Sequence, residues 1–459
     1  LKFRIGQWYA EASNDAMSLR VKRFASYADI HSLHMSTEIT AAARISLDIT
    51  TGIDGRVWNL NGCHAEGFNC GQHDEYLAAE LRTVQSGVDL HTLASSQLVV
   101  RDCKGARHAL KEFSLDSDKT DSSGYIFKKH SLVLEQGETL IIESCTALWT
   151  SNDTKREKVQ DAALSSVSMM KQEGYEAHSQ RHATCWEEHW RDFDITIEGD
   201  DPAALMLRYN LYHAVICVPM HTDHLPVGAR GLSCQAYQGA AFWDQEMFNM
   251  PMFLHTRPDI ARNILMYRYR TIDGARRKAE QLGYRGAFYP WISADTGDEI
   301  CPSYFFRDVI TGRKIRNHFN DWQIHISPDI SYAVRRYVET TGDTQFLAEY
   351  GAEMVFEIAR FIHARSHLNL LHDDVEILRV LGPDEYHENV DNNFYTNVIS
   401  RDACRYAWEV FCWMADKHPT ELKDAAQRIG LDREEPNQWE MLARKIRVPE
   451  VSKHSPVIE

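Results

Sequence analysis

The first third of the chain alternates hydrophobic and polar residues in short runs. Ile45, Leu47 and Ile49 occupy every second position, which is the signature of a half-buried strand. An apolar run at 132–134 is followed by the turn residues Gln136-Gly137, and residues 139–148 form a second apolar run. Short strands separated by Gly and Asp turns predict an antiparallel β-sandwich, which we place in residues 1–152.

The next segment, residues 153–198, is polar and helical in character. Trp186, Trp190 and Phe193 recur at helical spacing near its end. We therefore expect one linker helix from Lys155 to Asp194, packed against its neighbours by those aromatic side chains.

From residue 199 onward the hydrophobic period is helical. Asp201 is a candidate N-cap and Pro202 fits the first helical position. Apolar residues then recur at helical spacing, in steps of three, four or seven residues, in three stretches: Leu207, Leu211 and Val215; Leu347, Tyr350, Met354, Ile358 and Phe361; and Tyr395, Ile399, Tyr406, Val410 and Trp413. Long loops rich in Gly, Pro and Trp separate these helices. The pattern predicts an α-toroid with its site at one end, in a domain covering residues 199–459.

Composition narrows the class of protein. The chain has 459 residues and a formal net charge of -16, which argues against nucleic acid or an anionic membrane as a partner. Its ten cysteines are scattered without a close pair, so we expect free thiols in a cytoplasmic protein. No run of 18 apolar residues is present, and the 22 histidines follow no metal-binding spacing, so we expect neither a membrane span nor a metal site.

Candidate chemistry is concentrated in three loops that combine carboxylates with aromatic residues. Residues 381–393 place Asp384, Glu385 and Glu388 directly after a Gly-Pro turn signal, and loops are where catalytic groups tend to be displayed. Residues 283–299 and 242–246 mix aromatic residues with acids in the same way. Aromatic faces beside carboxylates and amides are typical of a surface that holds a sugar, so the chain is predicted to be a carbohydrate-active enzyme.

These loops resemble glycoside hydrolase family 65, which includes maltose, trehalose, kojibiose and nigerose phosphorylases and acid trehalases. The matching segments are 242–246, 263–270, 283–299, 382–385, Asn392-Asn393 and 395–397, in the order of the family. The resemblance implies an α+β multidomain fold: an N-terminal antiparallel β-sandwich, a helical linker and an (α/α)6 barrel. Family members are usually longer at both ends. We therefore expect a partial sandwich and an incomplete barrel, and expect this chain, expressed alone, to be poorly soluble and inactive.

The resemblance also implies roles for individual residues. Glu385 aligns with the family's general acid, whereas by itself it could be an acidic surface residue or a helix cap. Trp243 and Asp244 resemble a glucose-holding pair, and their structural alternative is a core Trp beside a capping Asp. Trp291, Asp295 and Glu299 either line the sugar pocket or brace their loop. The basic run Arg307, Arg313, Lys314 and Arg316 is either a solvated loop or the acceptor side of the site.

The function implied by the resemblance is inverting phosphorolysis of an α-glucosyl disaccharide to β-glucose 1-phosphate. Inorganic phosphate is then the co-substrate and no other cofactor is expected. An acid trehalase-type hydrolase and an inactive carbohydrate-binding fragment remain alternatives. The sequence does not identify the acceptor sugar. A homodimer is one possible oligomeric state, and the sequence does not decide it.

Overall fold

The structure is a computed structural model that describes residues 2–57, 62–232, 237, 239–304 and 306–449. It divides into two compact units, Leu1–Tyr212 and His213–Glu459. Nine cysteines of the described part are free thiols. The tenth, Cys234, lies outside the described residues.

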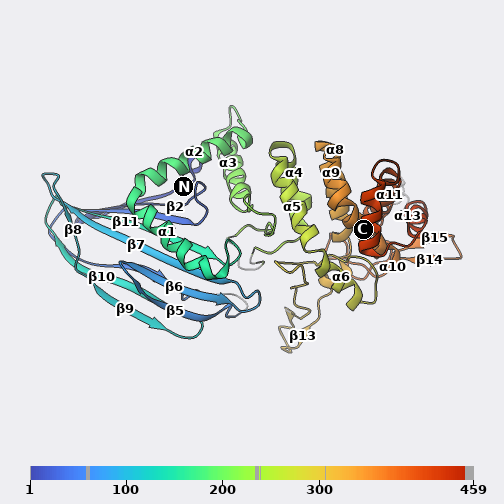
Figure 1. The fold of residues 1–459 in the computed structure, drawn as a ribbon, viewed down its shortest axis with the longest axis horizontal. Helices are drawn as coiled ribbons and strands as arrows, with labels where there is room; N and C mark the ends of the chain where they lie inside the picture. The colour runs from blue at the N-terminus through green and yellow to red at the C-terminus, as the bar shows by residue number, and fades with distance from the viewer. Residues whose placement is uncertain (1, 58–61, 233–236, 238, 305, 450–459) are drawn as a thin grey trace. The chain divides into compact units, whose positions relative to one another are not determined.

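The first unit is built on two antiparallel sheets (Figure 1). The larger has the order β1-β2-β3-β11-β7-β6-β5, with β8 paired to β7, and the smaller has the order β4-β10-β9. The strands are β1 Trp8–Ser13, β2 Met17–Ala25, β3 Ser32–Ala41, β4 Ile45–Asp54, β5 Ala65–His73, β6 Tyr76–Thr83, β7 Asp89–Arg101, β8 Arg107–Ala109, β9 Ser114–Lys119, β10 Gly124–Leu134 and β11 Thr139–Thr150. The predicted N-terminal antiparallel β-sandwich is confirmed.

The sandwich core contains the residues that the alternation singled out. β4 alternates between exposed and half-buried positions along its whole length. Its Ile45, Leu47 and Ile49 pack against a buried cluster from the other sheet and β10, which contains Ile39, Ala41, Leu98, Leu134, Leu140 and Ile142. Removing these side chains from water is the main force that holds the two sheets together.

The linker contains two helices and not the single helix that the sequence predicted. α1 Val159–Glu173 and α2 Tyr175–Phe193 meet at Gly174, whose φ of 79° is a conformation that favours glycine and interrupts the helical path. α3 Asp201–Ile216 follows, and its first turn is capped by Asp200, which accepts a hydrogen bond from the N–H of Ala203 at 3.0 Å. The predicted N-cap, Asp201, is therefore wrong by one residue.

A column of aromatic rings lies between the large sheet and α2. His34 of β3 stacks on His178 at a centroid distance of 4.4 Å and on Phe24 at 5.0 Å, and Phe24 stacks on His182 at 4.5 Å. Burial lowers the pKa of His34 to about 3, and the positive charge that nearby His178 would carry adds to that effect. Burial also lowers the pKa of His178 and of His182. Burial therefore disfavours the protonated form of all three imidazoles.

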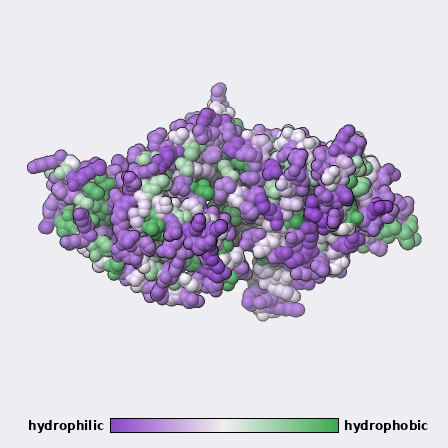
Figure 2. All heavy atoms as spheres, in the orientation of Figure 1, coloured by the Kyte–Doolittle hydropathy of each residue, from purple (hydrophilic) through white to green (hydrophobic). Residues whose placement is uncertain are grey.

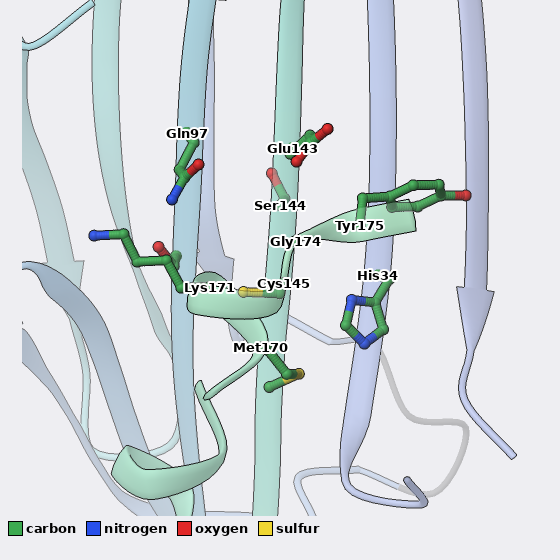
Figure 3. A pocket seen from close by; sticks show the side chains of 10 residues that line it. His34, Gln97, Glu143, Ser144, Cys145, Met170, Lys171, Gly174 and Tyr175 are labelled. Carbon is green, nitrogen blue, oxygen red and sulfur yellow. The ribbon is translucent and has the colours of Figure 1, made fainter. Parts of the chain in front are cut away.

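A small cavity adjoins this column (Figure 3). Its volume is about 20 Å³, which is room for a single water molecule. His34, Cys145, Met170 and Tyr175 are among its lining residues, and none of the predicted site residues is. We regard it as a packing feature of the first unit.

The second unit is helical. Its helices are α4 Met250–Thr256, α5 Pro258–Arg270, α6 Ile272–Gln281, α7 Phe319–Trp322, α8 Ile326–Thr341, α9 Thr344–Phe346, α10 Ala352–Arg365, α11 Phe394–Lys417, α12 Pro419–Ile429 and α13 Glu435–Lys445, with two π-helical turns, η3 Gln245–Asn249 and η4 Leu347–Gly351. Two short hairpins project from it, β12 Phe306–Arg307 with β13 Lys314–Ile315, and β14 His367–Asn369 with β15 Asp374–Glu376. α5 packs on α8, α8 on α10 and α11, and α11 on α13. The predicted helical region is confirmed, whereas closure into an (α/α)6 barrel stays a prediction.

The surface is mostly hydrophilic in the view of Figure 2, with scattered hydrophobic patches. The most exposed aliphatic side chains belong to the turns of the two hairpins: Val309, Ile310, Leu370 and Leu371. Among the described helices, none combines the length and the apolar composition that a membrane crossing needs. The described residues also contain no group of three His, Cys, Asp or Glu side chains placed to hold a metal ion.

Candidate active site

Two long loops, 282–325 and 366–393, meet beside the first turns of α8 and α11. The first loop is joined to the α8 start where the N–H of Tyr289 donates to Oγ of Ser327 at 2.9 Å. The two loops are joined where the N–H of Leu381 donates to the carbonyl of Trp322 at 3.1 Å. Residues far apart in sequence therefore converge on one end of the helical unit.

The loop that carries Glu385 is held at its base. Val380 and Val390 exchange two backbone hydrogen bonds of 2.9 and 3.0 Å. Gly382 approaches the side chain of Asn393 so closely that a Cβ at that position would lie 2.5 Å from Nδ2 of the amide. Asn393 in turn caps α11, accepting from the N–H of Thr396 at 2.9 Å. The Gly-Pro signal thus marks a site of close backbone approach, beyond which Glu385 is exposed.

Glu385 is connected to Trp291 through Gln323, a residue that the sequence analysis did not single out. Nε2 of Gln323 donates to Oε1 of Glu385 at 3.0 Å. Oε1 of the same amide accepts a hydrogen bond from Nε1 of Trp291. Gln323 is only 2% exposed, so the amide that connects Trp291 to Glu385 is buried, whereas Glu385 itself is exposed.

Trp291 and Glu299 stabilise the first loop from within. The indole is buried, stacked on Phe319 at 4.9 Å and met edge-on by Phe242 at 4.7 Å. The Glu299 carboxylate accepts from the backbone N–H groups of Trp291, Ile292 and Cys301 at 2.8, 3.1 and 3.1 Å. Nζ of buried Lys278 completes this set at 2.8 Å. For Glu299, these contacts favour the loop-bracing alternative over direct contact with sugar.

Trp243 and Asp244 lie at the start of η3, next to a buried polar cluster. His325 meets the Trp243 indole edge-on at 4.9 Å and is fully buried. Its Nδ1 lies 2.8 Å from Asp329, which also accepts a hydrogen bond from the Tyr395 hydroxyl at 2.7 Å. Burial raises the pKa of Asp244. Among the described residues, Oδ2 of Asp244 and Nε2 of His325 are buried polar atoms without a hydrogen-bond partner.

A buried ion pair anchors the 242–246 segment to α5. Arg268 and Glu246 are both fully buried and form two hydrogen bonds of 2.7 and 2.9 Å. Nη2 of Arg268 also donates to the carbonyl of Phe242 at 3.2 Å. These hydrogen bonds hold Phe242 and Glu246, which lie on either side of Trp243 and Asp244 in the sequence, and so fix the position of that pair. Removing either charged partner would leave the other charge stranded in the interior.

The remaining predicted groups lie at the periphery. Asp295 and Glu388 are exposed, and Asp384 is engaged within its own turn by the N–H of Tyr386 at 3.0 Å. The basic run is exposed along the β12–β13 hairpin: Arg307, Arg313, Lys314 and Arg316. The candidate site therefore contains two groups, Glu385 with Gln323 and Trp291, and Trp243 with His325. The Phe242 ring contacts both Trp243 and Trp291, at centroid distances of 6.5 and 4.7 Å, and so connects the two groups.

A cleft of about 270 Å³ opens beside Trp322, between the ends of α6 and α10. The Trp322 ring is stacked on His318 at 3.7 Å, and the Arg379 guanidinium lies 5.4 Å from the ring centroid. Both partners compete with a sugar for that indole, so we assign it to packing and not to substrate binding.

Two protein-family models match the chain, one for each of its parts. Residues 4–189 match the Glycosyl hydrolase family 65, N-terminal domain, and residues 208–458 match the Glycosyl hydrolase family 65 central catalytic domain. A solved structure assigned as a kojibiose phosphorylase from the human microbiome shares the fold with a TM-score of 0.83 at 20% identity, over 97% of this chain and 56% of that one.

Curated relatives extend the comparison to sequence. The chain is 43% identical to the 1,2-alpha-glucosylglycerol phosphorylase of Bacillus selenitireducens, over 95% of this chain and 55% of that protein. It is 33% identical to the kojibiose phosphorylase of Halothermothrix orenii, over 96% of this chain and 57% of that protein. The chain thus spans about half the length of these relatives. With both of its parts matched in order, the chain belongs to glycosyl hydrolase family 65.

Proposed function

We propose that the protein cleaves an α-glucosyl disaccharide by inverting phosphorolysis and releases β-glucose 1-phosphate. The relatives support the reaction class, since those named above and the nigerose phosphorylase of Lachnoclostridium phytofermentans, 34% identical, are all named as phosphorylases. Inorganic phosphate is the co-substrate in this proposal.

The observation that carries the proposal is the placement of Glu385. Its carboxyl group is exposed on a firmly held loop, and one of its oxygens is fixed by Gln323. As general acid, Glu385 gives its proton to the glycosidic oxygen while the bond from that oxygen to C1 breaks. A phosphate oxygen forms the new bond to C1 from the opposite face, and the released sugar leaves with the proton as its hydroxyl. Because phosphate is the nucleophile, no second carboxylate is required.

Trp243 and Asp244 are proposed to hold the glucosyl unit. The indole offers an apolar surface to the pyranose, and the buried Oδ2 of Asp244 is an acceptor that a sugar hydroxyl would satisfy. Trp291 and Asp295 are proposed to line the same region, Trp291 from its buried position and Asp295 from the exposed side of the loop.

Glucosylglycerol is a second candidate substrate. The relative at 43% identity is named for it, whereas the disaccharide phosphorylases cited here lie at 33% and 34%. Assaying the reverse reaction from β-glucose 1-phosphate with glycerol and with glucose as acceptors distinguishes the two substrates.

The test compares Glu385→Gln with Glu388→Gln, an exposed carboxylate on the same loop, in the protein at its full length. Loss of the general acid should lower disaccharide turnover by about 10²–10⁴-fold, while Glu388→Gln should stay near wild type. Products are analysed with and without phosphate. A Glu385→Gln variant with near wild-type turnover refutes the assignment, and equal release of free glucose under both conditions identifies a hydrolase of the trehalase type.

A further inference from the structure

Gln323 connects two residues that lie on different loops. Trp291 is 32 positions before it and Glu385 is 62 positions after it. Gln323 itself lies between α7 and α8, where Trp322 accepts backbone hydrogen bonds from Ile324 at 2.9 Å and from Leu381 at 3.1 Å. The Trp322 carbonyl thus closes a tight turn around Gln323 and ties that turn to the loop that carries Glu385.

The orientation of this amide is dictated by chemistry. An indole N–H can only donate, so the group that faces Nε1 of Trp291 must be the amide oxygen. The amide nitrogen then necessarily faces Glu385 and donates to Oε1. Trp291 cannot turn away, because it is stacked on Phe319 and its own backbone N–H is bound by Glu299.

We propose that Gln323 is the positioning residue of the general acid. With Glu385 as the general acid, on which this proposal rests, Gln323 also determines which oxygen of that carboxyl group carries the proton. In a protonated carboxyl group the carbonyl oxygen accepts hydrogen bonds better than the hydroxyl oxygen, so the amide N–H of Gln323 favours Oε1 as the carbonyl oxygen. The acidic proton is therefore held on Oε2, the oxygen that accepts no hydrogen bond from the described residues. Trp291 acts in turn on the amide, and through it on Glu385.

The arrangement predicts a selective defect. When the carboxyl group loses its partner it samples other rotamers, and proton delivery to the leaving oxygen becomes slower. A substrate whose leaving group departs without a proton avoids that step. α-Glucosyl fluoride is such a substrate, since its C1–F bond breaks and fluoride leaves as the ion while phosphate attacks C1.

The experiment measures phosphorolysis of the disaccharide and of α-glucosyl fluoride by the protein at its full length. Gln323→Ala should lower kcat on the disaccharide by about 10- to 100-fold, the scale of a misplaced catalytic group, with a much smaller change in KM. Turnover of the fluoride should change by less than about 3-fold. Trp291→Phe keeps the stacked ring but removes the donor, and should show the same selectivity at a smaller size. Gln281→Ala, on the exposed end of α6, is the matched control.

The possible outcomes distinguish a positioning role of Gln323 from a packing role. Equal losses on both substrates for Gln323→Ala assign the residue to packing, and an unchanged kcat shows that it positions nothing. If Gln323→Ala fails to fold, Trp291→Phe carries the test alone. Glu385→Gln is measured alongside: selective loss on the disaccharide upholds the general acid even if Gln323 fails its test. If Glu385→Gln loses neither activity or both equally, the proposed function itself fails.

Discussion

Lowering the pH from 7 to 5 should weaken the first unit through the buried imidazole of His34. The native pKa of His34 is about 3, whereas an unfolded histidine titrates near 6.5. Below pH 6.5 the unfolded state therefore binds a proton that the native state excludes. The contribution of His34 to the free energy of unfolding is fully present above pH 6.5. It decreases as the pH falls from 6.5 to 3 and is constant below pH 3.

The size of the effect follows from the two pKa values. At pH 5 the unfolded histidine is almost fully protonated, and the free energy of unfolding should be lower than at pH 7 by about 2 kcal/mol from His34 alone. The pKa of His178 and that of His182 are lowered in the same direction, so the loss for the whole column should be larger.

Hydrogen exchange of peptides covering β3 and α2, corrected for intrinsic rates, reports the local opening free energy at both pH values. His34→Phe keeps an aromatic ring in the column but removes the titration, so its pH dependence should be smaller than that of wild type by about 2 kcal/mol. His108→Phe replaces an exposed histidine of β8 and should leave the pH dependence unchanged. Identical pH dependence in wild type and His34→Phe would refute the reasoning.

Three substitutions should change stability by amounts that denaturant unfolding can measure. Glu246→Ala strands the buried Arg268 charge and should cost about 3–5 kcal/mol, most of it recovered when Arg268→Met is added; no recovery would contradict the charge argument. Gly286→Ala should cost more than Gly283→Ala, because both have φ near +80° but only at Gly286 would a Cβ meet the Glu357 carbonyl, at 2.3 Å; equal costs would leave backbone strain as the sole cause. Asp343→Ala removes the cap on the Phe346 N–H together with the acceptor of the Tyr337 hydroxyl and should cost about 1 kcal/mol or more, whereas Asp343→Asn keeps a capping oxygen and should restore most of it; a harmless Ala variant would show that neither contact contributes.

Local patterns predicted the elements better than their ends. The alternation in β4 and the sandwich depend on side chains two positions apart, which a sequence displays directly. The linker break at Gly174 depends on one positive φ, and the α3 cap depends on whether Asp200 or Asp201 turns toward the helix. Both are decided by backbone geometry that hydrophobic periodicity does not encode.

The candidate site shows the same limit. The loops that carry Glu385, Trp243 and Trp291 stood out because acids and aromatics cluster in them, and the resemblance to the family then singled out these three residues. Gln323 carried no such signal, since its partners are brought to it only by folding. His325 and Asp329 did carry one: a spacing of four residues at the start of a helix places both side chains on one face.

The fixed polarity of the Gln323 amide also constrains how this sequence can evolve. An indole donor at 291, an amide at 323 and a carboxyl at 385 form a directional series, and each position limits what the next can be. Losing the donor frees the amide to reverse, so that its oxygen faces a carboxylate and repels it. A protein with a single substitution at 291 or 323 would therefore position its general acid poorly. A paired substitution that keeps a donor facing an acceptor would not have this defect. Among relatives, positions 291 and 323 should therefore change together or remain as they are.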